Sequence, residues 1–144
     1  MRSKLIYDGP QRTFAVVMET GDEVLSNLSA FAREEKLSAA EITGIGALSD
    51  AVLGYFDWQT KDYERIPVEE QVEVLNLTGN VALDDGGEPK LHLHIVLGKR
   101  DGTAHGGHLL EGRVRPTLEV IVTESPAHLQ RRSDPETGLA LIRI

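Results

Sequence analysis

The chain has 144 residues and no cysteine, and its 23 acidic against 15 basic residues give a formal net charge of −8 at pH 7. The lack of cysteine excludes disulfides, thiolate zinc sites and cysteine nucleophiles, and the negative charge disfavours binding to polyanions. The length fits one domain over residues 1–144, which can bury a core without a structural metal. With neither a signal peptide nor a membrane-spanning apolar run, we expect a soluble cytoplasmic protein that contacts no membrane.

Two strands and one helix are predicted in the N-terminal part of the chain. The strands lie around Leu5 and over Phe14–Met18. Thr20 and Glu23 have the spacing of a capping box, in which the hydroxyl and the carboxylate satisfy free backbone donors. An amphipathic helix that ends near Lys36 is then predicted by apolar residues at helical spacing: Val24, Leu25, Leu28, Phe31 and Ala32.

The rest of the chain is rich in residues that favour β-strands. A turn signal at Asp84–Gly87 predicts a hairpin between the runs on either side of it. Val72 and Val74 lie out of phase with the apolar residues that follow, which indicates a bulge near Val74 or burial on both faces. Strands are predicted over six runs: Ala40–Leu48, Ala51–Trp58, Tyr63–Pro67, Val72–Leu83, Leu91–Leu97 and Val114–Val122.

The alternation of side chains in the last run predicts a sheet with one buried face. Val114, Leu118, Val120 and Val122 share one side of the strand, and Arg113, Arg115, Thr117 and Glu119 share the other. We therefore expect an α/β (α+β) fold with a curled, mostly antiparallel sheet or open barrel and one main helix packed on it. The basic pair Arg131 and Arg132 is expected on a solvated face.

Four of the five histidines lie between Leu91 and Gly112. In a β-strand alternate side chains share a face, so His92 and His94 should project together on the side opposite the neighbouring leucines and isoleucine. Two imidazoles at this spacing can bind one metal ion. Zinc accepts neutral imidazole nitrogens, and open catalytic sites combine three protein ligands with a water molecule.

The third ligand is predicted to be His108. Gly106 and Gly107 would let the backbone turn tightly enough to bring it opposite the first two histidines. His105 is the alternative third ligand, and a polar surface cluster without metal is the other interpretation. His128 is expected to be an ordinary surface residue.

Two carboxylates are candidates for supporting roles. Glu73 and Glu119 lie on predicted strands among apolar neighbours, where an ionised group needs a partner. Each is a candidate to orient a ligating imidazole or to act as an acid or base. The alternative for each is an ordinary side chain that faces solvent.

Motifs that match a known family lie at Gly44–Ala47, Leu53–Asp57, Val72–Gly79, Leu91–His94, Gly106–Leu109 with Gly112, and Leu118–Ile121. Through these segments the chain resembles the plants-and-prokaryotes-conserved (PPC) domain along nearly its whole length. The resemblance implies an α/β fold with a strongly bent antiparallel sheet, and a homotrimer. In plants this domain follows an AT-hook, and prokaryotic members are named DNA-binding by analogy. This chain has no Arg-Gly-Arg-Pro core, so we expect its association with DNA to be weak or indirect.

The histidine region also resembles the metal site of acetolactate decarboxylase. There, a His-x-His strand pair and the histidine of a Gly-Gly-His segment hold zinc, which implies His92, His94 and His108 here and favours His108 over His105. No motif matches the remaining glutamate and arginine groups of that enzyme. Two functions follow: a trimeric, regulatory metal-binding PPC protein, or a zinc-dependent, decarboxylase-like enzyme acting on a small carboxylic or hydroxy acid.

Overall fold

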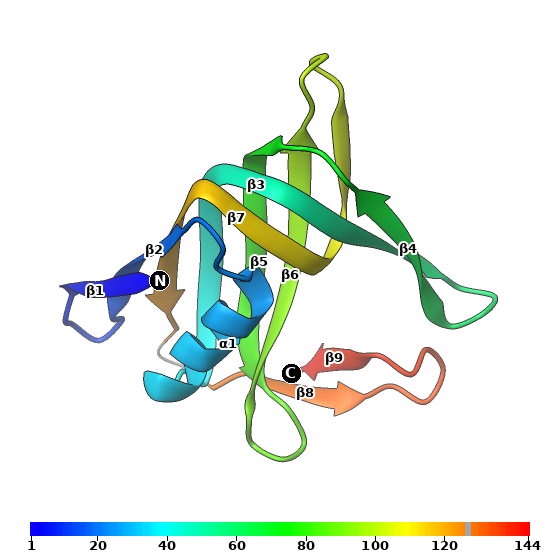
Figure 1. Cartoon of the computed structure of the whole chain (residues 1–144). Coiled ribbons are helices and arrows are strands. Elements are labelled where there is room, and N and C mark those ends of the chain that lie inside the picture. Colours follow the sequence, from blue (N-terminus) through cyan, green and yellow to red (C-terminus); the bar gives the residue numbers. More distant parts are fainter. Residues whose placement is uncertain (126–127) are drawn as a thin grey trace.

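In the computed structural model, which describes residues 1–125 and 128–144, these residues form a strongly bent sheet and one helix (Figure 1). This architecture confirms the expected α+β fold. The elements in chain order are β1 (Arg2–Tyr7), β2 (Thr13–Glu19), α1 (Val24–Glu34), β3 (Ala39–Asp57), β4 (Asp62–Val68), β5 (Val72–Leu83), β6 (Pro89–Gly98), β7 (Ala104–Glu124), β8 (Gln130–Ser133) and β9 (Ala140–Arg143).

The sheet bends because its two longest strands change partners along their length. β3 has 19 residues and pairs first with β5 and then with β4, while β7 has 21 residues and pairs first with β6 and then with β2. β3 and β7 also pair with each other, so the pairings β3–β5, β5–β6, β6–β7 and β7–β3 close a ring. Among the described residues every strand pairing is antiparallel except that between β5 and β8.

Most predicted strands are confirmed, but β7 begins at Ala104, ten residues before the predicted run Val114–Val122. The separate runs Ala40–Leu48 and Ala51–Trp58 are one strand, β3, whose register with β7 shifts on both sides of Leu48. At the preceding bend, a Cβ on Gly46 would overlap the backbone of β7 at Thr117, so a glycine there lets the two strands cross closely. The hairpin β8–β9 was not predicted.

The predicted bulge in β5 is confirmed. The register between β5 and β6 shifts between Val74 and Asn76, which leaves Leu75 as the extra residue. Val74 and Leu77 are buried, whereas Leu75 is 55% exposed. The bulge, and not burial on both faces, therefore explains the change of phase.

The predicted hairpin turn between β5 and β6 is also confirmed. The carboxylate of Asp84 accepts hydrogen bonds from the backbone amides of Gly86 and Glu88, at 2.9 and 3.0 Å. Gly87 has a φ of +82°, which glycine adopts without strain. This turn fixes the alignment of β6, which carries two of the candidate ligands.

Helix α1 begins later than a capping box at Thr20 would require. Glu23 is the N-cap, and its carboxylate accepts a hydrogen bond from the amide of Ser26 at 2.7 Å. Thr20 instead donates to the carbonyl oxygen of Pro116 at 3.2 Å. The predicted capping role of Thr20 was therefore wrong, whereas the Glu23 carboxylate does satisfy a free backbone donor. The intervening Gly21, with a φ of +93°, turns the chain before the helix starts. No helix in the described residues has the length and apolar character of a membrane span.

The core lies between α1 and the concave side of the sheet. The helix contacts β6 and β7, and its Phe31 packs edge-to-face on Phe14 of β2 with 5.2 Å between ring centroids. Phe31 and its buried neighbours on α1 supply one wall. In β7 the predicted buried face is confirmed by Val114, Leu118, Val120 and Val122.

Candidate metal centre

Three imidazoles meet on the outer face of the β6–β7 hairpin. In β6 the alternation is as predicted: Leu93, Ile95 and Leu97 are buried, while His92 and His94 face the other side. His108 of β7 lies opposite His94 in the strand register. One ring nitrogen from each histidine lies within 4.8 Å of the other two.

The structure brings His108 to this position by strand register and not by a glycine turn. Gly106 and Gly107 lie inside β7, and the turn between β6 and β7 occupies residues 99–103. A Cβ on Gly107 would lie 3.0 Å from the carbonyl oxygen of Gly54, so this glycine lets β3 approach β7 closely. The expected convergence of histidines is found, but the reason given for it was wrong.

His105 is not part of the cluster. It lies opposite Leu97, three pairs along the same regular ladder from the His94–His108 pair. Because side chains alternate between the faces of a strand, His105 points to the opposite face and is exposed. His128 is also exposed, as expected.

The structure does not bring Glu73 or Glu119 to the histidines. Glu73 lies opposite Gly98, four pairs along the β5–β6 strands from His94. Glu119 is eleven residues beyond His108 on β7, and a strand advances about 3.3 Å per residue. Both carboxylates are exposed, and among the described residues neither hydrogen-bonds a histidine.

The nitrogen atoms of the cluster lie at distances that suit a metal site, and one of them has no hydrogen-bond partner in the described part of the chain. The Nε2 atoms of His92 and His94 are 3.2 Å apart. Two nitrogens bound to one tetrahedral zinc at about 2.0–2.1 Å would be about 3.3 Å apart. Nδ1 of His108 is buried and has no hydrogen-bond partner among the described residues, although buried nitrogens are normally satisfied.

Burial keeps two of the imidazoles in the form that binds metals. Burial, together with smaller contributions from the nearby His92 and His94, lowers the pKa of His108 to about 4. Burial is also the main cause of the lowered pKa of His92, with contributions from Arg131 and His94. Both rings are therefore neutral at pH 7, and a neutral imidazole has a lone pair to donate. The donor set fits a divalent metal such as zinc.

Two further residues at this site were missed in the sequence. Tyr63 of β4 stacks on the His108 ring, with 4.7 Å between centroids and an angle of 26°, and burial raises its pKa. Arg131 of β8 was expected in solvent but is only 4% exposed. It donates hydrogen bonds to the carbonyl oxygen of Ala140 at 3.2 Å and to Oδ1 of Asn80.

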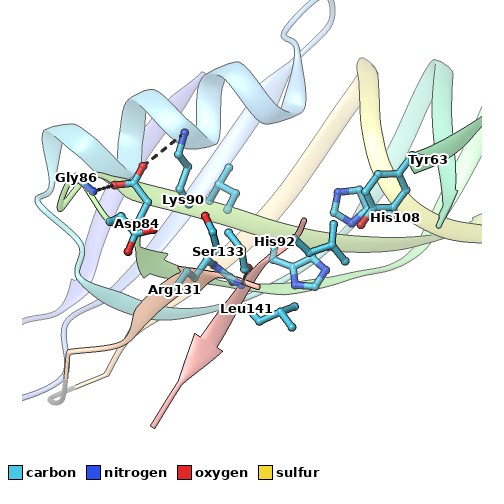
Figure 2. Close-up of a pocket in the computed structure, with 13 residues that line it drawn as sticks. Tyr63, Asp84, Gly86, Lys90, His92, His108, Arg131, Ser133 and Leu141 are labelled. Carbon is cyan, nitrogen blue, oxygen red and sulfur yellow. Dashed lines mark hydrogen bonds and ion pairs between the residues drawn. The ribbon is translucent and has the colours of Figure 1, made fainter. Parts of the chain in front are cut away.

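A cavity of about 440 Å³ adjoins the histidines (Figure 2). It is lined by His92 and His108 from the cluster, by Tyr63 and Arg131, and by residues of the β5–β6 turn and the β8–β9 hairpin. Its volume lies within the range of about 300–1,000 Å³ typical of small-molecule sites. The arrangement can hold a metal ion at one side of a space that admits a small ligand.

A glycine beside the cluster provides a test of how closely its strands are packed. Gly79 of β5 lies opposite Leu93 of β6, and a Cβ there would overlap the carbonyl oxygen of His92. We expect Gly79→Ala to force these strands apart, to destabilise the fold by about 1–3 kcal/mol and to weaken metal binding by moving His92. Urea denaturation and a zinc titration would measure both effects.

The matched control is Gly86→Ala in the β5–β6 turn. A Cβ on Gly86 would approach the Asp84 side chain at 3.2 Å and no backbone atom within 4 Å. This surface change is expected to alter stability by no more than about 0.5 kcal/mol. Equal stability of the two variants would contradict the close packing of β5 on β6.

Comparison with known proteins identifies relatives over nearly the whole chain. Residues 6–126 match the model of the Plants and Prokaryotes Conserved (PCC) domain. The chain is 36% identical to a plant- and prokaryote-conserved (PPC) protein of Pyrococcus horikoshii, with a TM-score of 0.86 and 92% of each chain covered. It is 33% identical to a metal-containing protein of Archaeoglobus fulgidus, with a TM-score of 0.84 over 100% of this chain and 99% of that one. A Ralstonia eutropha JMP134 protein provisionally named as DNA-binding is also 33% identical, with a TM-score of 0.84 over 91% and 90% of the two chains.

Two further proteins match this chain over only part of their own length. Acetolactate decarboxylase of Bacillus subtilis strain 168 shares the fold alone, with 12% identity and a TM-score of 0.56 over 88% of this chain and 58% of that one. The bifunctional protein GlmU of Synechococcus sp. (strain JA-3-3Ab) is 31% identical over 139 residues, or 94% of this chain. The chain spans only 21% of the length of that curated relative. From the match over residues 6–126, the chain belongs to the Plants and Prokaryotes Conserved (PCC) domain family, as its sequence motifs indicated.

Proposed function

We propose that this protein binds one divalent metal ion, best matched by zinc, through His92, His94 and His108. The observation that carries this proposal is the convergence of three ring nitrogens within 4.8 Å. The unpartnered, buried Nδ1 of His108 supports it, and so does the metal-containing relative from Archaeoglobus fulgidus. A zinc ion held by three imidazoles supplies a Lewis acid with a position open to water or a ligand.

We propose a regulatory binding role in preference to catalysis. An acid or base within hydrogen-bond reach of the reacting group is the usual companion of a catalytic metal. In this chain the two candidate carboxylates, Glu73 and Glu119, lie far along their strands from the histidines. The cavity beside His92 and His108 favours a second candidate, a zinc-dependent enzyme that acts on a small carboxylic or hydroxy acid.

We also propose that residues 1–144 form one domain that assembles as a homotrimer. One continuous cluster of buried residues supports the single domain. The outer face of β2, β3 and β7 supports assembly, because it has a hollow lined by Val17, Ile45 and Ile121, and Ile45 is 61% exposed. Exposed apolar faces of this kind are usually covered by a partner. Light scattering should give three chain masses, and one chain mass at micromolar concentration would contradict the trimer.

Zinc is expected to stabilise the folded protein against heat and urea. A ligand that binds only the folded state at 100 times its dissociation constant adds about 2.7 kcal/mol to the free energy of unfolding. Differential scanning calorimetry should show a higher Tm with zinc and its reversal by a chelator. Magnesium is the control, because it prefers oxygen ligands and should leave Tm unchanged. No shift with zinc, or an equal shift in His108→Ala, would contradict the proposal.

We propose that any association with DNA is weak or indirect. The net charge is −8, and several of the basic side chains are paired with carboxylates, including Arg12 with Glu124 and Arg132 with Asp85. Phosphate contacts from lysine and arginine supply most non-specific affinity for DNA. Fluorescence anisotropy with an A·T-rich duplex should give a Kd no better than about 10⁻⁵ M at physiological salt. Submicromolar binding that survives chelation would instead make DNA binding the leading function.

A further inference from the structure

Arg131 is a buried charge without an opposite charge beside it. Its side chain is 4% exposed, and its Nε–H has no hydrogen-bond partner among the described residues. Its other contacts, to Ala140 and Asn80, are with neutral oxygens. Within the described residues, Arg131 takes part in none of the ion pairs. A guanidinium stays charged, and a buried charge needs a partner. An anion beside Arg131 would supply that partner.

The same cavity contains Arg131 and two of the proposed metal ligands. Asn80, which accepts a hydrogen bond from Arg131, lies opposite His92 in the β5–β6 register. Figure 2 shows Arg131, His92 and His108 around the cavity. A metal ion at the histidines would add a second positive centre to this space. An anion in the cavity would offset both charges.

The other charged groups of the cavity already have partners. Lys90 lies 3.8 Å from Asp84, and Asp85 lies 2.7 Å from Arg132. Arg131 is therefore the one lining charge without an opposite partner among the described residues. A ligand that balances the charge of Arg131 would therefore be negatively charged.

We propose that this cavity binds a small organic acid and that Nε–H of Arg131 donates a hydrogen bond to its carboxylate. This inference rests on the proposed function in placing the acid next to a metal site. Leu91, Leu139 and Leu141 line the cavity and provide contacts for an apolar body. Phosphate sites usually present several converging donors, whereas Arg131 is the one lining cation without an opposite partner among the described residues, and two aspartates line the same space.

Arg131 belongs to a part of the chain outside the family match. The matched segment ends at residue 126, and β8 begins at Gln130. The hairpin β8–β9 lies against the end of β5 through the pair Leu83 and Gln130 (Figure 1). The hairpin thus contributes Arg131, Leu139 and Leu141 to the cavity. The histidines of the same cavity come from the matched segment.

Isothermal titration calorimetry with 3-methylbutanoate and its neutral amide tests the proposal on the zinc-loaded full chain. We expect the carboxylate to bind at least tenfold more tightly than 3-methylbutanamide, since charge-assisted hydrogen bonds are the stronger ones. Arg131→Met should lose at least tenfold in affinity for the carboxylate and keep its zinc. Arg143→Met is the matched control: Arg143 lies on β9 of the same hairpin, is exposed and pairs with Asp134, so binding should not change.

Each other outcome of this experiment is decisive. Equal binding of acid and amide, unchanged binding by Arg131→Met, or tighter binding of inorganic phosphate would overturn the proposal. Zinc binding without carboxylate binding would overturn this inference and leave the metal site standing. Arg131-dependent carboxylate binding by a protein that holds no zinc would support the inference while the proposed metal function fails. If Arg131→Met does not fold, two measurements still test the proposal. One is carboxylate binding by Arg131→Lys, which keeps the charge but lacks Nε–H. The other is the comparison of acid with amide on the unchanged protein.

Discussion

Replacing His94 or His108 by Ala is expected to lower the zinc affinity of the protein at least about a hundredfold. The two residues face each other across β6 and β7, so each variant leaves two imidazoles to hold the ion. Loss of a group that merely orients a ligand already costs about 10- to 100-fold in affinity, and loss of a ligand should cost at least as much. Competition with a chromophoric chelator measures the change. His94 is exposed, so the substitution should leave the fold intact.

His105→Ala is the matched control for this experiment. The residue lies on the same hairpin, opposite Leu97, and faces away from the cluster. Its replacement should change zinc affinity by less than about twofold, within the ordinary range of surface substitutions. A loss comparable with that of His108→Ala would show that the third ligand had been assigned incorrectly.

Leu97→Ala is expected to lower the free energy of unfolding by about 2–5 kcal/mol. Leu97 is completely buried on β6, in the core cluster under the strand that carries His92 and His94. Its truncation leaves a cavity and removes contacts that hold β6 in place. Urea denaturation of the metal-free protein measures the change without a contribution from bound ions.

Val96→Ala is the neighbouring control. Val96 is 37% exposed and lies on the same side of β6 as the histidines. The expected loss is within about 0.5 kcal/mol. A larger loss in Val96→Ala than in Leu97→Ala would place the core on the histidine face and contradict the described orientation of β6.

The sequence predicted the local features of the site because they depend on alternation within one strand. The apolar residues of β6 determine which face is buried, and His92 and His94 follow on the other. The shift of phase after Val74 predicted the bulge in β5 for the same reason. In each case the neighbours in sequence are the neighbours in structure.

Features that depend on pairing between distant strands could not be derived in this way. The position of His108 comes from its register with His94, and Tyr63 reaches His108 only because β4 pairs with β3 beside β7. Arg131 and Arg132 look alike in sequence, but β8 turns one inward beneath β9 and the other outward. The available sequence signal for this hairpin was Gly138, a turn-forming glycine, which has a φ of +75° in the structure.

The carboxylate predictions show the same limit. Glu73 and Glu119 were chosen because their neighbours in sequence are apolar, a pattern that any strand with one exposed face produces. Both side chains face outward at positions of β5 and β7 that lie away from the histidines. Distance along the strand therefore separates them from the proposed metal.

The metal content of the full chain, purified without chelator and loaded with one equivalent of zinc, tests the central claim most directly. Elemental analysis should give one ion per chain. X-ray absorption at the zinc edge should show three imidazole nitrogen ligands at about 2.0–2.1 Å and a fourth, oxygen ligand from water or a carboxylate. Protein that contains no metal and retains no added zinc after gel filtration would contradict the assignment of His92, His94 and His108 as a metal site.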